Sequence, residues 1–151
     1  MNLLRQFSGR PIGLLIDTGE LMPILFSRDT LSSFLRIAAA MLVMVMVLNL
    51  FFWGSQPVAI NLVPAPWDKF LHGTTFAVLA CGIGLASGLQ GSRGLIIAMA
   101  GALSIGALDE WHQMYLPGRH PSWGDLLADV IGSLAGVALL ILWRRSRNTH
   151  N

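Results

Sequence analysis

The sequence has little charge. Only 12% of its 151 residues are Asp, Glu, Lys or Arg, whereas 54% are hydrophobic, and its mean hydropathy is +0.61. A water-soluble domain of this length needs more polar residues to cover its surface. This balance excludes an ordinary soluble domain and predicts an integral membrane protein, with the lipid bilayer covering much of its surface.

Cysteine and clustered basic residues are also scarce. Cys81 is the single cysteine, which excludes an intrachain disulfide, and we interpret it as a small packing residue. The basic residues are dispersed, apart from Arg144, Arg145 and Arg147 directly after an apolar run. This dispersal argues against a nucleic-acid partner, and the cluster looks instead like a signal for membrane topology.

The short motifs that hold nucleotides or metals are missing. The chain contains no P-loop, GxGxxG, CxxC or HExxH motif, so we expect no cofactor. Several ionisable residues could ligate a metal, namely His72, Glu110, His112, His120, Asp125 and Asp129. Their spacing follows no recognised zinc or calcium pattern, so we expect no metal site.

Four apolar segments are long enough to cross a bilayer: residues 37–53, 70–89, 95–115 and 126–143. They predict an all-α, polytopic membrane protein with about four transmembrane helices in a bundle. The third segment is cleanly apolar only to Leu108, and residues 109–113 either continue the helix or form a solvated loop. The expected organisation is an N-terminal cytoplasmic or interfacial segment (1–33), a first transmembrane helix (34–54), a three-helix region (67–143) and a basic cytoplasmic tail (144–151).

The distribution of Lys and Arg predicts the orientation. Eight arginines fall on one side of the predicted spans, and Lys69 and Arg119 fall on the other. Because cytoplasmic loops carry the excess of basic residues, we expect both termini in the cytoplasm of a multi-pass protein of the plasma (inner) membrane. The first span starts late and is longer than a signal-peptide core, which favours an uncleaved anchor.

The last three predicted helices share one pattern of polar and small residues. At about 100° per residue, each places polar residues at its outer end in line with small residues at its inner end. The aligned positions are Asp68, His72, Thr75, Gly82 and Ala86; Ala98, Ala102, Gly106, Asp109, Glu110 and Gln113; and Asp125, Asp129, Gly132 and Gly136. Small residues let helices approach closely, and ionisable groups avoid lipid, so these faces predict a packed bundle with an outward-facing polar pocket.

The candidate ligand-binding residues belong to this pocket: Asp68, Lys69, His72, Glu110, Gln113, Arg119, Asp125 and Asp129. Some have structural explanations as well. Asp68 and Asp125 could satisfy free amides at helix N-termini, and Asp129 could be hydrogen-bonded inside the bundle. Arg119 is suited to bind phosphate or carboxylate, but it and Lys69 could instead neutralise neighbouring carboxylates. If the protein is an enzyme, which the sequence does not decide, Glu110, His72 and Asp129 are the candidates for acid–base catalysis.

The polar anchors of the second half resemble those of a known family. The string comprises Asp68-Lys69-x-x-His72, Glu110-x-x-Gln113-x-x-x-Pro117-Gly118-Arg119 and Asp125-x-x-x-Asp129-x-x-Gly132-x-x-x-Gly136, and it is similar to VanZ-like membrane proteins from about Trp67 to Trp143. The family often has Tyr where Phe76 stands and commonly Asn where Asp129 stands. The resemblance implies a cell-envelope role related to glycopeptide-antibiotic (teicoplanin) resistance, without an established reaction.

Three functions remain open from the sequence. The pocket could bind an envelope component or an amphiphilic small molecule. Alternatively, the protein is a membrane-embedded enzyme that acts on envelope lipids, with Glu110 or Asp129 as acid or base and His72 as a proton shuttle or metal ligand. In the third hypothesis the bundle is a scaffold for a membrane partner, whose identity the sequence does not give. No charged residue lies in the inner halves of the spans, which argues against a channel.

Overall fold

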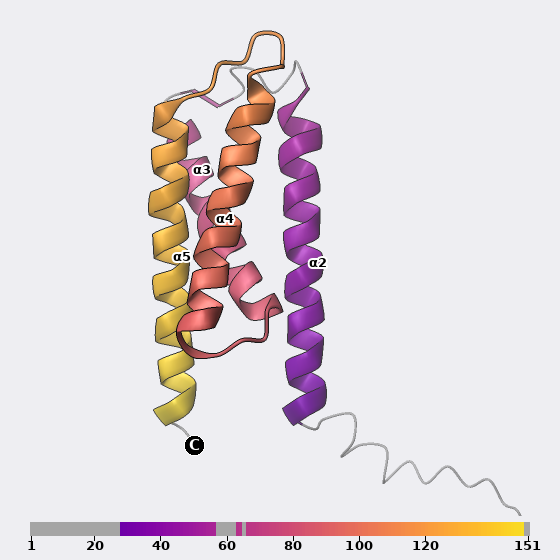
Figure 1. The fold of residues 1–151 in the computed structure, drawn as a ribbon, viewed down its shortest axis with the longest axis vertical. Helices are drawn as coiled ribbons and strands as arrows, with labels where there is room; N and C mark the ends of the chain where they lie inside the picture. The colour runs from indigo at the N-terminus through magenta and orange to yellow at the C-terminus, as the bar shows by residue number, and fades with distance from the viewer. Residues whose placement is uncertain (1–27, 57–62, 65, 150–151) are drawn as a thin grey trace, which may run out of the picture. The chain divides into compact units, whose positions relative to one another are not determined.

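The computed structural model describes residues 28–56, 63–64 and 66–149. These residues form four helices and no strand: α2 (Arg28–Gly54), α3 (Trp67–Ala86), α4 (Gly91–Gln113) and α5 (Trp123–Thr149) (Figure 1). The chain divides into two compact units, Met1–Leu31 and Ser32–Asn151. The first unit contributes only the start of α2 to the described residues. Most of the predicted N-terminal segment, residues 1–27, therefore lies outside them, and the arrangement below is that of the second unit.

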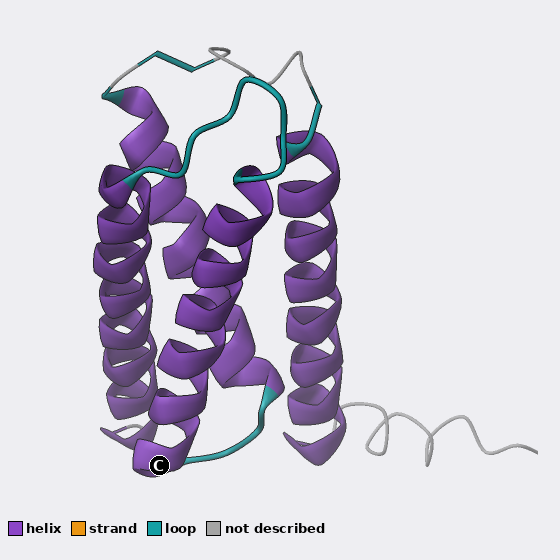
Figure 2. Cartoon of the chain, turned by 45° about the horizontal axis from the view of Figure 1, so that its top comes forward, coloured by secondary structure: helices purple, strands orange, loops and turns teal. Residues whose placement is uncertain are grey.

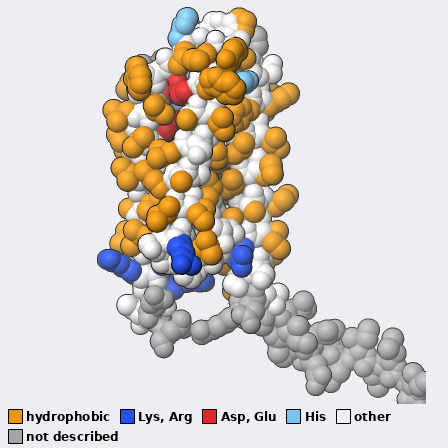
Figure 3. All heavy atoms as spheres, in the orientation of Figure 1, with side chains coloured by type: hydrophobic (Ala, Val, Ile, Leu, Met, Phe, Trp, Pro, Cys, Tyr) orange, Lys and Arg blue, Asp and Glu red, His pale blue; other side chains and the backbone are white. Residues whose placement is uncertain are grey.

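All four helices are long and apolar enough to cross a membrane. The candidate spans are Thr30–Gly54, Trp67–Ala86, Gly91–Gln113 and Trp123–Arg147, with mean hydropathies between 1.3 and 2.3. The shortest has 20 residues, and 20 residues at 1.5 Å each match a hydrocarbon core of about 30 Å. Many large apolar side chains are exposed on the helices, as lipid contact requires (Figure 3). The prediction of an all-helical chain with four helices long and apolar enough to span a membrane is confirmed for the described residues.

The ends of the helices settle one open question and shift several boundaries, because α2, α4 and α5 begin earlier than the predicted spans and α5 continues to Thr149. α4 continues through Gln113, so residues 109–113 are helical and the alternative of a solvated loop is wrong. α3 ends at Ala86 and not near Leu89, because Gly88 adopts a φ of +63°. A glycine in this left-handed conformation commonly terminates a helix.

α3, α4 and α5 pack on one another, and the contact between α3 and α5 is the most extensive (Figures 1 and 2). Glycines on α5 make this contact close. A Cβ atom at Gly132 would overlap the carbonyl oxygen of Gly73, and one at Gly136 would overlap that of Ala77. The spacing of Gly132 and Gly136 thus brings the two backbones together, as expected for small residues between membrane helices.

α2 joins this group mainly through side chains. Its residues Val43, Met46, Val47 and Leu50 pack, with others, against a buried cluster of Phe76, Leu79, Ala80 and Ala102. The contact is close at Gly82, where a Cβ atom would lie 2.7 Å from Cγ2 of Val43. The backbone of α2 therefore lies further from α3 than the backbone of α5 does.

Charges of opposite sign collect at opposite ends of the helices (Figure 3). The acidic end, where α2 and α4 end and α3 and α5 begin, carries Asp68, Asp109, Glu110, Asp125 and Asp129; the basic end carries Arg36, Arg93, Arg144, Arg145 and Arg147. At the basic end, Arg144 of α5 donates hydrogen bonds to the carbonyl oxygens of Gly84 (3.2 Å) and Leu89 (3.1 Å). This arginine fastens the turn between α3 and α4 to α5.

Candidate functional site

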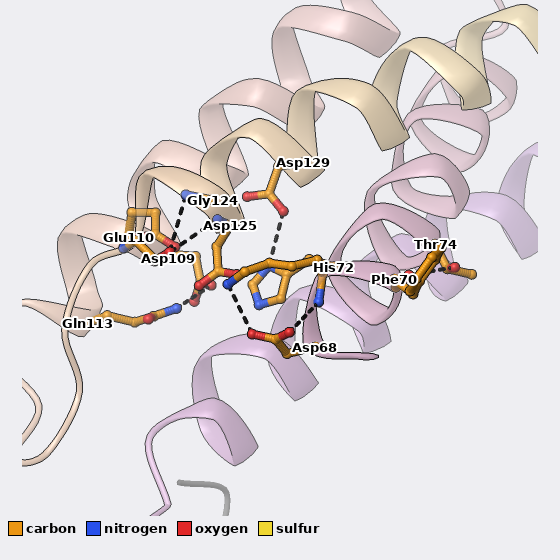
Figure 4. A network of polar contacts seen from close by, with 12 residues as sticks. Asp68, Phe70, His72, Thr74, Asp109, Glu110, Gln113, Gly124, Asp125 and Asp129 are labelled. Carbon is orange, nitrogen blue, oxygen red and sulfur yellow. Dashed lines mark hydrogen bonds and ion pairs between the residues drawn. The ribbon is translucent and has the colours of Figure 1, made fainter. Parts of the chain in front are cut away.

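Lys69 lies between two carboxylates at the acidic end. Its Nζ is 2.9 Å from Oδ2 of Asp68 on the same helix and forms a second ion pair with Oδ1 of Asp125 on α5 (Figure 4). Asp68 also accepts a hydrogen bond from the backbone amide of Lys69 at 2.8 Å. The positive charge of Lys69 is thus balanced within the protein, which favours the neutralising role over a role in binding an anion.

The first turn of α5 is capped by a residue that the sequence analysis did not select. The hydroxyl oxygen of Ser122 accepts hydrogen bonds from the amides of Gly124 (3.2 Å) and Asp125 (3.4 Å). Serine is a preferred residue at this position. Asp125, which could have been the cap, directs its carboxylate to Lys69 instead. The Ser-x-Gly-Asp sequence at the start of the helix was the available signal.

Three polar side chains at the end of α4 are buried: Asp109 is 3% exposed, Glu110 9% and Gln113 6%. Gln113 donates a hydrogen bond from Nε2 to Oδ2 of Asp109 at 2.9 Å. Oε2 of Glu110 accepts a hydrogen bond from the backbone amide of Ser122 at 2.7 Å. Glu110 thereby ties the end of α4 to the residue that caps α5, while its Oε1 has no hydrogen-bond partner.

His72 and Asp129 form a pair between α3 and α5. The distance between Nδ1 of His72 and Oδ1 of Asp129 is 3.0 Å, and their side chains are 19% and 1% exposed. The ring of Phe76 lies one turn along α3 and is parallel to the imidazole, with an interplanar angle of 6°. The second carboxylate oxygen of Asp129 has no hydrogen-bond partner. Asp129 is the most buried ionisable side chain of the predicted site.

A cavity of about 630 Å³ opens among these residues at the acidic end. Its polar wall includes Asp68, His72, Thr75, Asp109, Gln113, Arg119, His120 and Asp125, and its apolar wall includes Met46, Leu50, Trp53 and Leu71. Five of the eight predicted site residues line it. The other three, Lys69, Glu110 and Asp129, are not among the lining residues and bond to Asp125, Ser122 and His72, respectively.

α2 supplies most of the apolar wall, although the sequence analysis assigned it no part in the site. The site was predicted from ionisable residues, and α2 has none between Arg36 and its C-terminal end. The signal that could have identified it is Asn49, a polar residue within an apolar span, one turn before Trp53. Both residues line the cavity.

Arg119 differs from Lys69 in its surroundings. It lies in the loop between α4 and α5, which runs over the acidic end in Figure 2. Its side chain lines the cavity, and Nε is buried without a hydrogen-bond partner. Within residues 28–56, 63–64 and 66–149, it forms no ion pair. Arg119 therefore presents to the cavity a positive charge without an ion pair, although Asp109 in the same wall interacts with it electrostatically.

In the described part of the chain, no three His, Cys, Asp or Glu side chains are grouped so that they could hold a metal ion. The carboxylates are directed to Lys69, His72, Gln113 and the amide of Ser122.

Comparison with known proteins gave one match. A family model described as VanZ/LLP1 matches residues 5–144. This range is wider than the segment from Trp67 to Trp143 in which the polar anchors lie. Neither the curated proteins nor the solved structures contained a match.

Proposed function

The chain belongs to the VanZ/LLP1 family, and from this membership we propose that its cavity binds an amphiphilic component of the cell envelope. The ligand has an anionic headgroup and an apolar chain. Arg119 contacts the anionic group, while Gln113 and the carboxylates of Asp68 and Asp125 fix the orientation through hydrogen bonds to donor groups elsewhere on the headgroup. A role in glycopeptide susceptibility, which the family resemblance implies, would act through this ligand.

The observation that carries the proposal is the unpaired guanidinium of Arg119 in a cavity with an apolar wall. A guanidinium presents several N–H donors in a plane and suits phosphate or carboxylate oxygens. Met46, Leu50 and Trp53 on α2 face the same cavity. The guanidinium of Arg119 and the apolar residues of α2 together match a molecule that is charged at one end and apolar at the other.

The size of the cavity also supports a small-molecule or headgroup ligand. Ligand sites in proteins usually measure about 300–1,000 Å³ and combine apolar walls with a few polar groups. The cavity has about 630 Å³, which would hold a lipid headgroup with the first part of its chain. Lipid acyl chains would continue along the exposed apolar surface of α2.

The expected orientation places this ligand on the outer side of the membrane. The basic end carries Arg93, Arg144, Arg145 and Arg147, and such residues collect on the cytoplasmic side of membrane proteins. The acidic end then faces outward in the plasma (inner) membrane. We infer that the ligand comes from the outer leaflet or from the envelope beyond it.

Native mass spectrometry of the purified protein tests the proposal. Wild-type protein should retain a defined lipid or envelope-derived adduct, and Arg119→Ala should lose at least about nine-tenths of it, as loss of a charge-assisted contact of about 1.5–3 kcal/mol predicts. Arg93→Ala is the matched control, because Arg93 is an exposed arginine at the basic end. An adduct of equal abundance in wild type and Arg119→Ala would rule the proposal out.

A further inference from the structure

His72 stands between a buried carboxylate and the cavity. Its Nδ1 lies 3.0 Å from Oδ1 of Asp129, whose side chain is 1% exposed (Figure 4). His72, whose side chain is 19% exposed, is one of the residues that line the cavity. No described residue forms a hydrogen bond with Nε2, the other ring nitrogen. The geometry therefore leaves Nε2 available to a molecule in the cavity.

The partner on Nδ1 determines what Nε2 can do. An ionised carboxylate only accepts hydrogen bonds, so a neutral His72 must carry its proton on Nδ1 and a lone pair on Nε2. In hydrolases with a Ser-His-Asp triad, a buried aspartate holds the catalytic histidine in the same tautomer. The ring of Phe76 lies parallel to the imidazole, with the ring centroids 6.4 Å apart. His72 thus has the arrangement of an oriented base.

We propose that His72 is a general base that hydrolyses a carboxylic ester of an amphiphile bound in the cavity, with Asp129 as its positioning residue. This proposal rests on the proposed function, because the ester must occupy the same cavity. Arg119, which contacts the headgroup of this amphiphile in the proposed function, lines the same cavity and also offsets negative charge that develops on the ester. A single cation suits the oxyanion of an ester. In phosphoryl transfer the negative charge is spread over several oxygens, and several cations usually stabilise it.

The reaction consumes one water molecule. Nε2 of His72 takes a proton from water, while the water oxygen bonds to the ester carbonyl carbon and the carbonyl electron pair moves onto its oxygen. The C=O bond then re-forms and the bond to the alcohol oxygen breaks. The leaving oxygen takes the proton back from Nε2, which yields one carboxylic acid and one alcohol and restores His72.

Hydrolysis of p-nitrophenyl butyrate, octanoate and palmitate by the full chain in detergent micelles tests the base. Wild type should release p-nitrophenolate from at least one ester, and His72→Gln should lower kcat by about 10²–10⁴-fold. His112→Gln is the matched control. That histidine packs beside Phe51, with ring centroids 5.3 Å apart, and does not line the cavity, so its kcat should stay within about twofold of wild type.

Asp129→Asn tests the positioning role, because the amide has nearly the shape of the carboxylate. It should lower kcat with little change in KM. In ¹⁵N NMR spectra of histidine-labelled protein at a pH where His72 is neutral, wild type should show the Nδ1–H form. The variant should shift toward Nε2–H, because the amide can donate to Nδ1. Circular dichroism and gel filtration confirm that the variants are folded.

Two results would overturn the inference: no hydrolysis of any of the three esters above the His72→Gln background, or equal kcat in wild type and His72→Gln. Native mass spectrometry on the same preparations separates this failure from failure of the binding proposal. If the Arg119-dependent adduct is present without hydrolysis, only the general-base role fails. If hydrolysis depends on His72 but no adduct depends on Arg119, the binding role of Arg119 fails and the base remains.

Discussion

Asp129 shows how far a single position could be interpreted from the sequence. Its place on a face with Gly132 and Gly136 predicted that it points into the bundle, and its side chain is fully buried. The sequence could not identify His72 as its partner, because the two are 57 residues apart and their pairing depends on how α3 and α5 rotate against each other.

Lys69 gives a prediction at the same scale. Lys69→Ala removes the cation between Asp68 and Asp125 and leaves two carboxylates close together. We expect the thermal unfolding midpoint in detergent to fall by about 2–4 °C, a modest change because the lysine is 37% exposed. In Lys69→Arg, which keeps the charge, the unfolding midpoint should fall less.

A double variant checks that the effect comes from the pairing. In Lys69→Ala with Asp125→Asn, one of the two facing carboxylates is also neutralised. The double variant should therefore lose less stability than the sum of the two single variants. Strict additivity would show that the ion pair does not couple α3 to α5.

Among the elements, α4 was predicted most accurately. The predicted face of Ala98, Ala102, Gly106, Asp109, Glu110 and Gln113 is buried throughout, with Gly94 in addition. Helical spacing of small and polar residues was sufficient, because α4 packs on two other helices. α2 was harder to interpret, since an apolar helix gives no sign of which side faces lipid and which lines a cavity. The end of α3 depends on the backbone conformation of one glycine.

Glu110 should hold the end of α4 to the start of α5. Glu110→Ala removes the acceptor of the Ser122 amide, and loss of a hydrogen bond to a charged group costs about 1.5–3 kcal/mol. We expect faster hydrogen–deuterium exchange in the 114–122 loop and at the first turn of α5. Glu110→Gln keeps an acceptor oxygen and should change exchange less. Unchanged exchange in Glu110→Ala would mean that the loop is held by other contacts.

The contact between α3 and α5 predicts a sharp response at Gly132. Gly132→Ala places a methyl group against the backbone carbonyl of Gly73, which cannot move aside as a side chain would. Overpacking of this kind costs about 1–3 kcal/mol, visible as a lower unfolding midpoint. Gly54→Ala is the control, because a Cβ atom there meets nothing within 4 Å. Equal midpoints for the two variants would contradict the close contact.

The separation of charge across the whole bundle predicts its orientation. In a Cys81→Ala background, His120→Cys marks the acidic end and Ser146→Cys the basic end. A membrane-impermeant maleimide added to intact spheroplasts should label His120→Cys, whereas Ser146→Cys should react only after the membrane is permeabilised. Labelling of Ser146→Cys in intact spheroplasts would reverse the orientation and place the cavity in the cytoplasm.

The pairing of α3 with α5 has a consequence for biosynthesis. A ribosome completes α3 before α5 exists, so Lys69 and His72 enter the membrane without Asp125 and Asp129, their partners on the last helix. Ionisable groups without partners are costly in lipid. The nascent chain must therefore keep α3 near the translocon or at the interface until α5 is made, and a chain truncated after Pro121 should be recognised by quality-control proteases as unassembled.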